Sequence, residues 1–224
     1  MSHPIPVNLL PMPAEAGRAE VLGERRRYSR ELAQAALRTV ELYEAAYVDP
    51  LTGLGNRRML DEKLPKLFRF AEGYGLPIAL AFADIRGLKR TNDKDGHEVG
   101  DRLIKAGAAA FSSILRDGDL AIHLGGDEFV GVFMGYTPKK DQTPEELDNA
   151  TINRLTESFD AAAVANGIPP ERHVSLDVAI MTAQPGDTPE SLLVRADKAM
   201  QSHKDAFYAD MERRGQKIHD NRVA

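Results

Sequence analysis

The chain has 224 residues, of which 42% are hydrophobic and 28% are charged, a composition typical of a globular protein rather than a disordered one. Its formal net charge of -5 disfavours non-specific binding to nucleic acid. No apolar run approaches the roughly 18 residues of a membrane span, and the lack of cysteine excludes disulfides and thiolate metal sites. We therefore expect a cytoplasmic protein with no membrane span and no nucleic-acid partner.

The N-terminal quarter of the chain divides into two segments. Residues 1–13 carry four prolines, so they form neither a regular helix nor a central strand, and we expect a flexible tail. Residues 14–47 contain no proline, and gaps of three and four predict one helix with an apolar stripe at Tyr28, Leu32, Ala36, Val40, Tyr43 and Tyr47. This helix either lies on the surface of the following domain or forms a dimerising or regulatory stalk that pairs with a second copy.

Residues 48–208 alternate between helical and strand patterns. Helical spacing predicts helices at 58–71, 100–114, 144–166 and 191–212, and apolar runs predict strands at 78–83, 120–122, 130–134 and 174–182. This alternation predicts an α/β or α+β sandwich in which helices pack on a sheet. We place the end of the domain at residue 208 and expect a charged tail over 209–224.

A short acidic motif lies between two of the predicted strands. Gly125-Gly126-Asp127-Glu128-Phe129 separates two apolar runs, which predicts a β-hairpin. The motif places two adjacent carboxylates next to bare glycine backbone, an arrangement that suits a hard cation and a polyphosphate. For the hairpin alone, a solvated acidic turn is an equally good interpretation.

The segment that follows the first strand carries groups suited to a phosphate. The strand delivers Asp84 to its C-terminal end, where ligands bind in many sheet proteins. Gly87 lets the backbone approach an anion, so its N–H and that of Leu88 can hold phosphate oxygens. Lys89 adds a positive charge. Taken singly, each of these residues is also explained as a solvated loop side chain.

Two further side chains in the same segment suit a guanine base. Asn92 offers an amide and Asp101 a carboxylate. A carboxylate accepts two N–H groups from one planar edge, which is what guanine N1–H and N2–H present. A solvated loop again explains either residue alone, so the prediction depends on the joint pattern.

Taken together, these motifs resemble the GGDEF domain of diguanylate cyclases over about residues 47–208. The resemblance also includes the segments 49–57, 96–97 and 195–200, followed by Lys204. It implies a palm-like fold with a central, mostly antiparallel sheet flanked by helices. It further implies that two GTP molecules condense into cyclic di-GMP with release of pyrophosphate, in a homodimer whose monomers each supply half of a symmetric site.

The resemblance assigns roles to single positions. It implies two Mg²⁺ ions per half-site, with Mn²⁺ as an alternative, held by Asp84, the Ile85 carbonyl, Asp127 and Glu128. The implied catalytic residues are Asp84, Asp127 as the proton acceptor, and Glu128 as a supporting acid. Guanine is assigned to Asn92 and Asp101, with His97 beside the nucleotide, and phosphate contacts are assigned to Gly87, Leu88, Lys89, Gly126 and Lys204.

A second site is implied just before the hairpin. Arg116 and Asp119 match the family's RxxD inhibitory motif, which binds the product cyclic di-GMP. Arginine can clamp a guanine edge and a phosphate, and aspartate can accept from guanine N–H groups. An ordinary helix-to-strand turn with a surface ion pair is the alternative interpretation.

The chain departs from the family pattern at several positions. The family usually has Asp, Phe, Arg, Gly and Arg where this chain has Arg86, Leu88, His123, Asp177 and Tyr208. We hypothesise that Arg86 supplies the phosphate-binding charge that is missing at position 208. The departures also leave two other functions open, namely a degenerate module that binds GTP or cyclic di-GMP and signals to a partner, and an enzyme with altered base choice. Asp101 argues against altered base choice.

Overall fold

A computed structural model describes residues 15–169 and 174–213. The predicted N-terminal tail and most of the predicted C-terminal tail lie outside these residues. The chain divides into two units, one that ends at Glu44 and one that begins at Ala45. The first unit consists, in its described part, of the helix α1, which continues into the second unit and spans Glu15–Tyr47.

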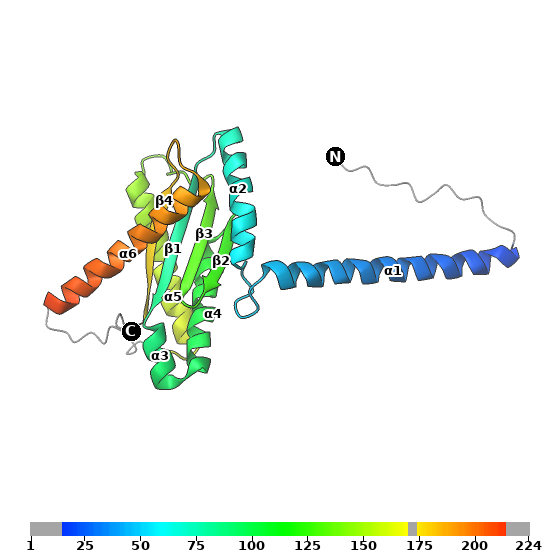
Figure 1. The fold of residues 1–224 in the computed structure, drawn as a ribbon, viewed down its shortest axis with the longest axis horizontal. Coiled ribbons are helices and arrows are strands. Elements are labelled where there is room, and N and C mark those ends of the chain that lie inside the picture. Colours follow the sequence, from blue (N-terminus) through cyan, green and yellow to red (C-terminus); the bar gives the residue numbers. More distant parts are fainter. Residues whose placement is uncertain (1–14, 170–173, 214–224) are drawn as a thin grey trace. The chain divides into compact units, whose positions relative to one another are not determined.

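The second unit is built around one antiparallel sheet (Figure 1). In the described part of the chain the sheet has four strands in the order β2-β3-β1-β4. Their bounds are Ile78–Arg86 for β1, Leu120–Gly125 for β2, Glu128–Met134 for β3 and Ser175–Thr182 for β4. The predicted antiparallel α+β architecture is confirmed.

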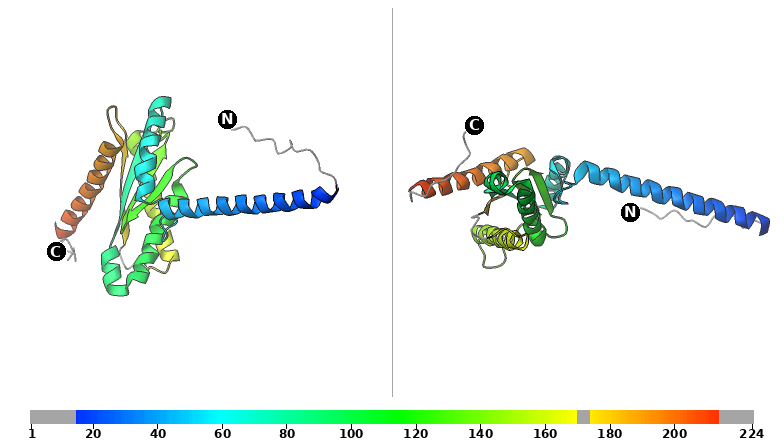
Figure 2. Two further views of the ribbon diagram at one scale, coloured as in Figure 1. Left: turned by 45° about the vertical axis from the view of Figure 1, so that its right-hand side comes forward. Right: turned by 90° about the horizontal axis from the view of Figure 1, so that it is seen from below.

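Helices cover both faces of this sheet (Figure 2). One face packs against α2 and α6, and the other packs against α4 and α5, while α3 packs on α4. The helices span Arg57–Tyr74 for α2, Leu88–Asp95 for α3, His97–Ile114 for α4, Pro144–Ala165 for α5 and Pro189–Arg213 for α6. Side-chain caps define two of the starts, because Asn56 accepts from the Met59 N–H and Thr143 forms a capping box with Glu146.

The alternation of side chains along the central strand divides the core in two. On β1, Leu80 and Phe82 pack into the cluster beneath α2 and α6. Their neighbours Ala81 and Ile85 pack into the cluster beneath α4 and α5. Because successive side chains of a strand point to opposite faces, Asp84 emerges on the α2 and α6 side, at the end of a buried apolar strand.

Several element bounds differ from the sequence-based expectation. The helix α3 has no predicted counterpart, since most of its residues are polar and Leu88 and Thr91 alone are buried. Gly87 and Gly96 both adopt positive φ angles, so α3 is a short helix between two glycine turns. The helix α6 continues to Arg213, past the expected domain end at residue 208.

The described part of α1 exposes its apolar side chains. Leu32, Val40 and Tyr43, which belong to the predicted stripe, are all exposed, as are Leu22, Tyr28, Leu37 and Leu42. Within residues 15–169 and 174–213, none of the helices combines the length and the apolar character needed to cross a membrane.

Candidate functional site

Three carboxylates form a row across one end of the sheet. In the strand register Asp84 of β1 lies directly opposite Glu128 of β3 on one side and Asp177 of β4 on the other. All three lie on the face covered by α2 and α6, as the alternation of buried neighbours on each strand shows. Asp177 was not among the predicted site residues, because its place beside Asp84 depends on a register that the sequence does not reveal.

The central carboxylate of this row is buried and paired with a lysine. Asp84 is 5% exposed, and the Lys204 ammonium on α6 lies 2.7 Å from its Oδ1. Burial raises the pKa of Asp84 to about 6, helped by the negative charges of Asp127 and Asp177 and opposed by Lys204. The site thus concentrates negative charge around a group that resists ionisation, which favours a cation at this place.

The hairpin tip brings the second carboxylate pair to the same end of the sheet. Gly126 and Asp127 form the turn between β2 and β3, and the Asp127 carbonyl accepts from the Ile85 N–H at 3.0 Å. Burial raises the pKa of Glu128, with the charges of Asp127 and Asp197 acting in the same direction. Asp84, Asp127 and Glu128 are therefore close enough to repel one another.

These groups fit a divalent ion by their chemistry. Carboxylate and carbonyl oxygens are the ligands that Mg²⁺ prefers, and a cation would relieve the repulsion that raises the pKa of Asp84 and of Glu128. In the described part of the chain, no three or more His, Asp or Glu side chains converge closely enough to hold an ion. The Lys204 ammonium is the cation that faces Asp84 here, and the assigned metal ligands stay a prediction.

Backbone groups suited to phosphate lie next to this row. Gly87, with φ of 91°, precedes α3, so the N–H groups of Leu88 and Lys89 belong to the first turn of a helix. The Lys89 side chain is exposed, whereas the Leu88 side chain is buried in the core and contributes only its backbone. Gly126 is exposed with φ of 62° at the hairpin tip.

The predicted guanine readers lie on two helices in contact. Asn92 is on α3 and Asp101 on α4, and both are half-buried, while His97 is exposed at the start of α4. Asn92 Oδ1 is buried without a hydrogen-bond partner. A Cβ placed on Gly100 would lie 1.8 Å from this oxygen, so the glycine makes room for the amide. The unsatisfied oxygen is a group that a bound base could satisfy.

Residues 46–207 match the family model described as diguanylate cyclase, GGDEF domain. This chain belongs to that family. It is 35% identical over 182 residues to the response regulator PleD of Caulobacter vibrioides, a match that covers 81% of this chain and 38% of PleD. It is also 35% identical over 116 residues to the diguanylate cyclase DgcS of Shewanella oneidensis, covering 52% of this chain and 39% of DgcS. The chain thus spans about two fifths of the length of either relative.

Solved structures show the same fold. The coiled coil and GGDEF domain of DgcB from Caulobacter crescentus, in complex with c-di-GMP, aligns with a TM-score of 0.68 at 22% identity, covering 83% of this chain and 95% of that one. A sensory box/GGDEF family protein from Caulobacter crescentus CB15 aligns with a TM-score of 0.59 at 30% identity, covering 72% and 99%. The expected palm-like GGDEF fold is therefore confirmed.

In this GGDEF domain the loop between α1 and α2 contacts the hairpin strand β2. Asp49 accepts hydrogen bonds from the N–H and the hydroxyl of Thr52, and His123 Nδ1 lies 3.0 Å from the same carboxylate oxygen. Burial opposes ionisation, but the Thr52 and His123 contacts hold the pKa of Asp49 below its usual value. His123 Nε2 also lies 3.2 Å from the Gly126 carbonyl. His123, where the family usually has arginine, thus links this loop to the hairpin tip.

Arg86 contacts a neighbouring carboxylate and an aromatic ring. Its Nε donates to Asp177 Oδ2 at 2.9 Å, its Nη2 donates to the other carboxylate oxygen, and its guanidinium lies 3.4 Å from the centre of the Phe207 ring. The hypothesis that Arg86 binds phosphate in place of the arginine that the family usually has at position 208 stays a prediction, and this chain has the half-buried Tyr208 there. Two departures from the family pattern, Arg86 and Asp177, pair with each other.

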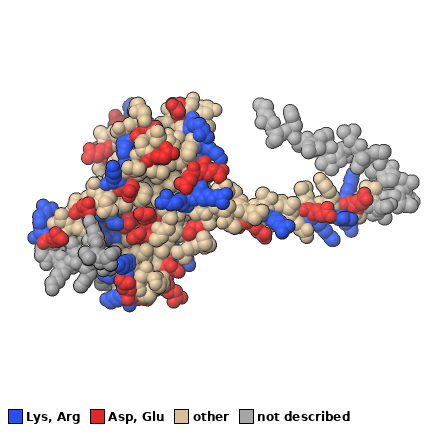
Figure 3. Space-filling view, in the orientation of Figure 1, with Lys and Arg blue, Asp and Glu red and all other residues tan. Residues whose placement is uncertain are grey.

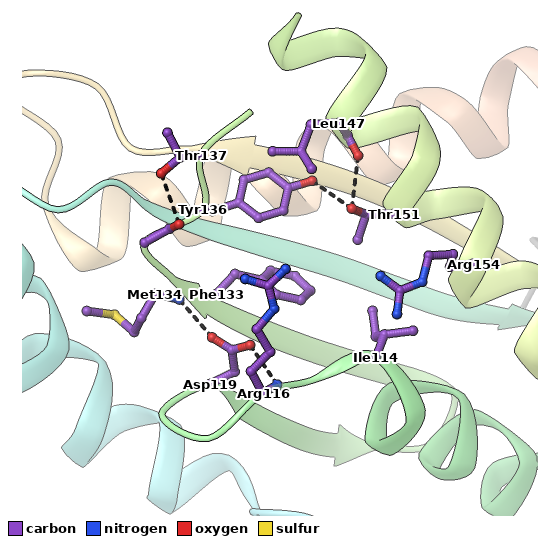
Figure 4. Close-up of a pocket in the computed structure, with 11 residues that line it drawn as sticks. Ile114, Arg116, Asp119, Phe133, Met134, Tyr136, Thr137, Leu147, Thr151 and Arg154 are labelled. Atoms are coloured by element: carbon purple, nitrogen blue, oxygen red, sulfur yellow. Dashed lines mark hydrogen bonds between the residues drawn. The ribbon is translucent and has the colours of Figure 1, made fainter. Parts of the chain in front are cut away.

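The predicted product-binding motif borders a pocket on another part of the domain (Figure 4). Asp119 uses both carboxylate oxygens to accept backbone N–H groups, from Arg116 at 2.9 Å and from Met134 at 2.9 Å. The Arg116 side chain is exposed beside the pocket. Asp119 therefore has a structural role in the turn, and the product-binding role of the motif stays a prediction.

The residues on the opposite wall of this pocket were not among the predicted site residues. Arg154 and Thr151 of α5 face it, together with Tyr136, two residues after the end of β3 (Figure 4). The Tyr136 hydroxyl donates to Thr151 Oγ1 at 3.0 Å, and burial raises the pKa of Tyr136. No local pattern marks these residues, since only the packing of α5 on the sheet brings them opposite Arg116.

Acidic and basic side chains are interspersed on the face of the molecule drawn in Figure 3. The described residues on this face do not form one continuous basic surface. This mixture agrees with the expectation from the net charge of -5, although the absence of a nucleic-acid partner stays a prediction.

Proposed function

We propose that this chain is a diguanylate cyclase that condenses two GTP molecules into cyclic di-GMP and pyrophosphate. The observation that carries the proposal is the carboxylate row at the end of the sheet, in which Asp84 faces Glu128 in the strand register with Asp127 beside them. Family membership over residues 46–207 supports the reaction class.

In the proposed reaction the ribose 3′-oxygen of one GTP attacks the α-phosphorus of the other. The bond from that phosphorus to the oxygen of the leaving pyrophosphate breaks, and the 3′-hydroxyl proton passes to Asp127. Repeating the step with the roles of the two nucleotides exchanged closes the ring. Each half-site therefore binds one nucleotide, and a homodimer provides both.

Divalent ions fit this site as cofactors. Asp84, Asp127, Glu128 and the Ile85 carbonyl are the groups that would hold them, with two Mg²⁺ ions per half-site and Mn²⁺ as an alternative. When bound, such ions lower the cost of deprotonating the 3′-hydroxyl and neutralise the triphosphate. The Lys204 ammonium contacts one oxygen of Asp84, so the other oxygen would be available to an ion, and Lys204 would also face a phosphate oxygen bound there.

The remaining predicted residues position the nucleotide. We assign the N–H groups of Gly87 and Leu88, together with Lys89 and Gly126, to the phosphate oxygens. We assign Asn92 and Asp101 to the guanine edge, with His97 near the base. A carboxylate at position 101 accepts from guanine N1–H and N2–H, which adenine does not present as a pair.

Product inhibition is a further part of the proposal. We place cyclic di-GMP in the pocket beside Arg116, where Arg154 supplies a second guanidinium and Asp119 holds the turn. Two guanidinium groups and an aromatic ring suit a dinucleotide with two phosphates and two planar bases. We further propose a cytoplasmic location, where GTP is available.

The test is a turnover assay with the purified chain, Mg²⁺ and labelled GTP, with and without ATP. The proposal predicts cyclic di-GMP as the product, no mixed cyclic dinucleotide when ATP is added, and a loss of at least about a hundredfold in the activity of the Asp127→Ala variant. Absence of any cyclic product, combined with tight binding of GTP or cyclic di-GMP, would favour the degenerate signalling module instead. A mixed product would indicate altered base choice.

A further inference from the structure

The Arg86 and Asp177 side chains form an ion pair at the edge of the carboxylate row. The two hydrogen bonds from Arg86 join both oxygens of the Asp177 carboxylate, a fork geometry that arginine makes and lysine does not. The side chains are only 16% and 8% exposed, so solvent does little to weaken the pair.

The pair lies next to the proposed metal position. Asp177 is directly opposite Asp84 in the β1 and β4 register, on the same face of the sheet. Arg86 is two residues after Asp84 on β1, so it shares that face and reaches diagonally to Asp177. Without Arg86, the row would present Asp177 as a second carboxylate beside Asp84, within reach of the same cation.

The helix α6 joins the pair to the proposed phosphate lysine. Phe207 lies beneath the Arg86 guanidinium, and Lys204, three residues earlier on the same face of α6, contacts Asp84. The two contacts hold α6 to two neighbouring points of β1. Arg86 is therefore held by two contacts, one with Asp177 within the sheet and one with the Phe207 ring of α6.

We propose that Arg86 is a positioning residue that masks Asp177, so that neither the divalent ion nor Lys204 is drawn from Asp84 to the neighbouring carboxylate. This inference depends on the proposed function, because it assigns the masking to that same site. It explains why the two departures occur together in this chain. An acidic residue at position 177 beside Asp84 is compatible with catalysis only if a fixed cation neutralises it.

The test compares Mn²⁺ binding with turnover in the full chain. We expect Arg86→Gln to tighten Mn²⁺ binding about tenfold in the absence of nucleotide, because an unmasked charge joins the site. We expect kcat to fall at least about tenfold in the same variant, because the ion and Lys204 shift toward Asp177. The double variant Arg86→Gln with Asp177→Asn removes the competing charge and should return both quantities to within about threefold of the wild type.

The Arg86→Gln variant is expected to bind Mn²⁺ more tightly while its kcat falls. This combination distinguishes masking of Asp177 from damage to the fold. A merely structural role for Arg86 predicts weaker Mn²⁺ binding and no rescue, because the single and the double variant alike remove the guanidinium that packs on Phe207. Either result would overturn the inference. If Arg86→Gln does not fold, Arg86→Lys serves instead, with an expected tightening of about threefold, since lysine keeps the charge without the fork.

A matched control lies on the same helix. Arg195 on α6 pairs with Asp187, away from the carboxylate row. Arg195→Gln, alone or combined with Asp187→Asn, should leave Mn²⁺ affinity unchanged, and a shift equal to that of Arg86→Gln would contradict the local mechanism. Failure of the proposed function itself would appear differently, as a wild-type chain that binds Mn²⁺ but forms no cyclic product.

Discussion

Ionisation of the buried Asp84 side chain costs more free energy than ionisation of a carboxylate on the surface. Its burial and its acidic neighbours raise its pKa to about 6, so the ionised form that would hold a cation is disfavoured in the folded protein without one. Lys204 offsets part of this cost by a contact at 2.7 Å. The buried charge of Asp84 therefore lowers the stability of the folded protein, a pattern common at functional sites.

This electrostatic cost predicts a pH-dependent stability difference. The unfolded pKa of aspartate is about 3.9 and the folded value is higher, so the native state binds the extra proton between them and loses stability as pH rises through this window. In chelator, Asp84→Asn should gain up to about 3 kcal/mol relative to the wild type between about pH 4 and 7. Denaturant titration at several pH values measures this, and a pH-independent difference would refute it.

Asp49 is a control whose effect on stability should change with pH in the opposite direction. Its pKa is lowered in the folded state, so its stabilising contribution is present above the unfolded pKa and is lost as pH falls through the folded pKa. Asp49→Asn should therefore be destabilised near pH 7 and approach the wild type in acid. The same denaturant titrations test it, and a variant that is most destabilised in acid would show that the sign is wrong.

The close approach of Asn92 to Gly100 predicts how a substitution at position 100 changes the KM for GTP. A methyl group at position 100 would collide with Asn92 Oδ1, so Gly100→Ala should displace the amide and raise the KM for GTP roughly tenfold or more. Gly73→Ala is the matched control, because a Cβ there meets nothing within 4 Å in helix α2. Equal KM values for the two variants would contradict the guanine-reading role of Asn92.

Several single residues were predictable from the sequence and others were not. Asp84, Asp127 and Glu128 stand out because they end or begin apolar strands, and the hairpin brings them to one end of the sheet. The pairing of Arg86 with Asp177 was not predictable, since the two are separated by 91 positions and meet only through strand register. For the same reason Arg86 was assigned to phosphate in our hypothesis.

At the scale of elements, the turn between α4 and β2 separates two roles within one motif. Asp119 holds this turn through backbone N–H groups, whereas Arg116 projects its side chain outward. Asp119→Ala should cost about 2 kcal/mol of unfolding free energy, and Arg116→Ala should cost less than about 0.5 kcal/mol. Thermal or denaturant unfolding distinguishes them, and equal losses would contradict this division.

The arginines of the same pocket differ from Asp119 in their expected response to product. Arg116→Ala and Arg154→Ala should each raise the cyclic di-GMP concentration needed for half-inhibition by roughly tenfold or more, because each removes a guanidinium from the pocket. Inhibition curves measure this. Unchanged curves for both variants would place product binding elsewhere.

Helix α3 could not be predicted from the spacing of apolar residues. The eight residues Leu88–Asp95 have two buried side chains, too few for a periodic apolar signal. Their helix is set by positive-φ glycines at both ends and by packing on α4. Strands β1 and β3 were predictable because their apolar runs are long. The antiparallel direction of the strands was expected from the family resemblance and not from those runs.

At the scale of the whole molecule, α1 leaves an apolar stripe exposed that includes Leu32 and Val40. Of the two interpretations drawn from the sequence, we propose the dimerising stalk, because an apolar stripe of this length suits pairing with a second copy of the helix. A chain beginning near Tyr47 should lose activity at low protein concentration and partly regain it at high concentration. Rates measured against concentration, with light scattering, test this, and equal specific activity at all concentrations would contradict it.

The central claim is that the carboxylate row catalyses the joining of two GTP molecules. The most direct measurement quantifies pyrophosphate and cyclic di-GMP together from the purified full chain with Mg²⁺ and GTP. We expect two pyrophosphates for each cyclic dinucleotide, and loss of both products in Asp84→Asn and in Asp127→Asn. Undetectable product at micromolar enzyme, or undiminished product in either variant, would contradict it.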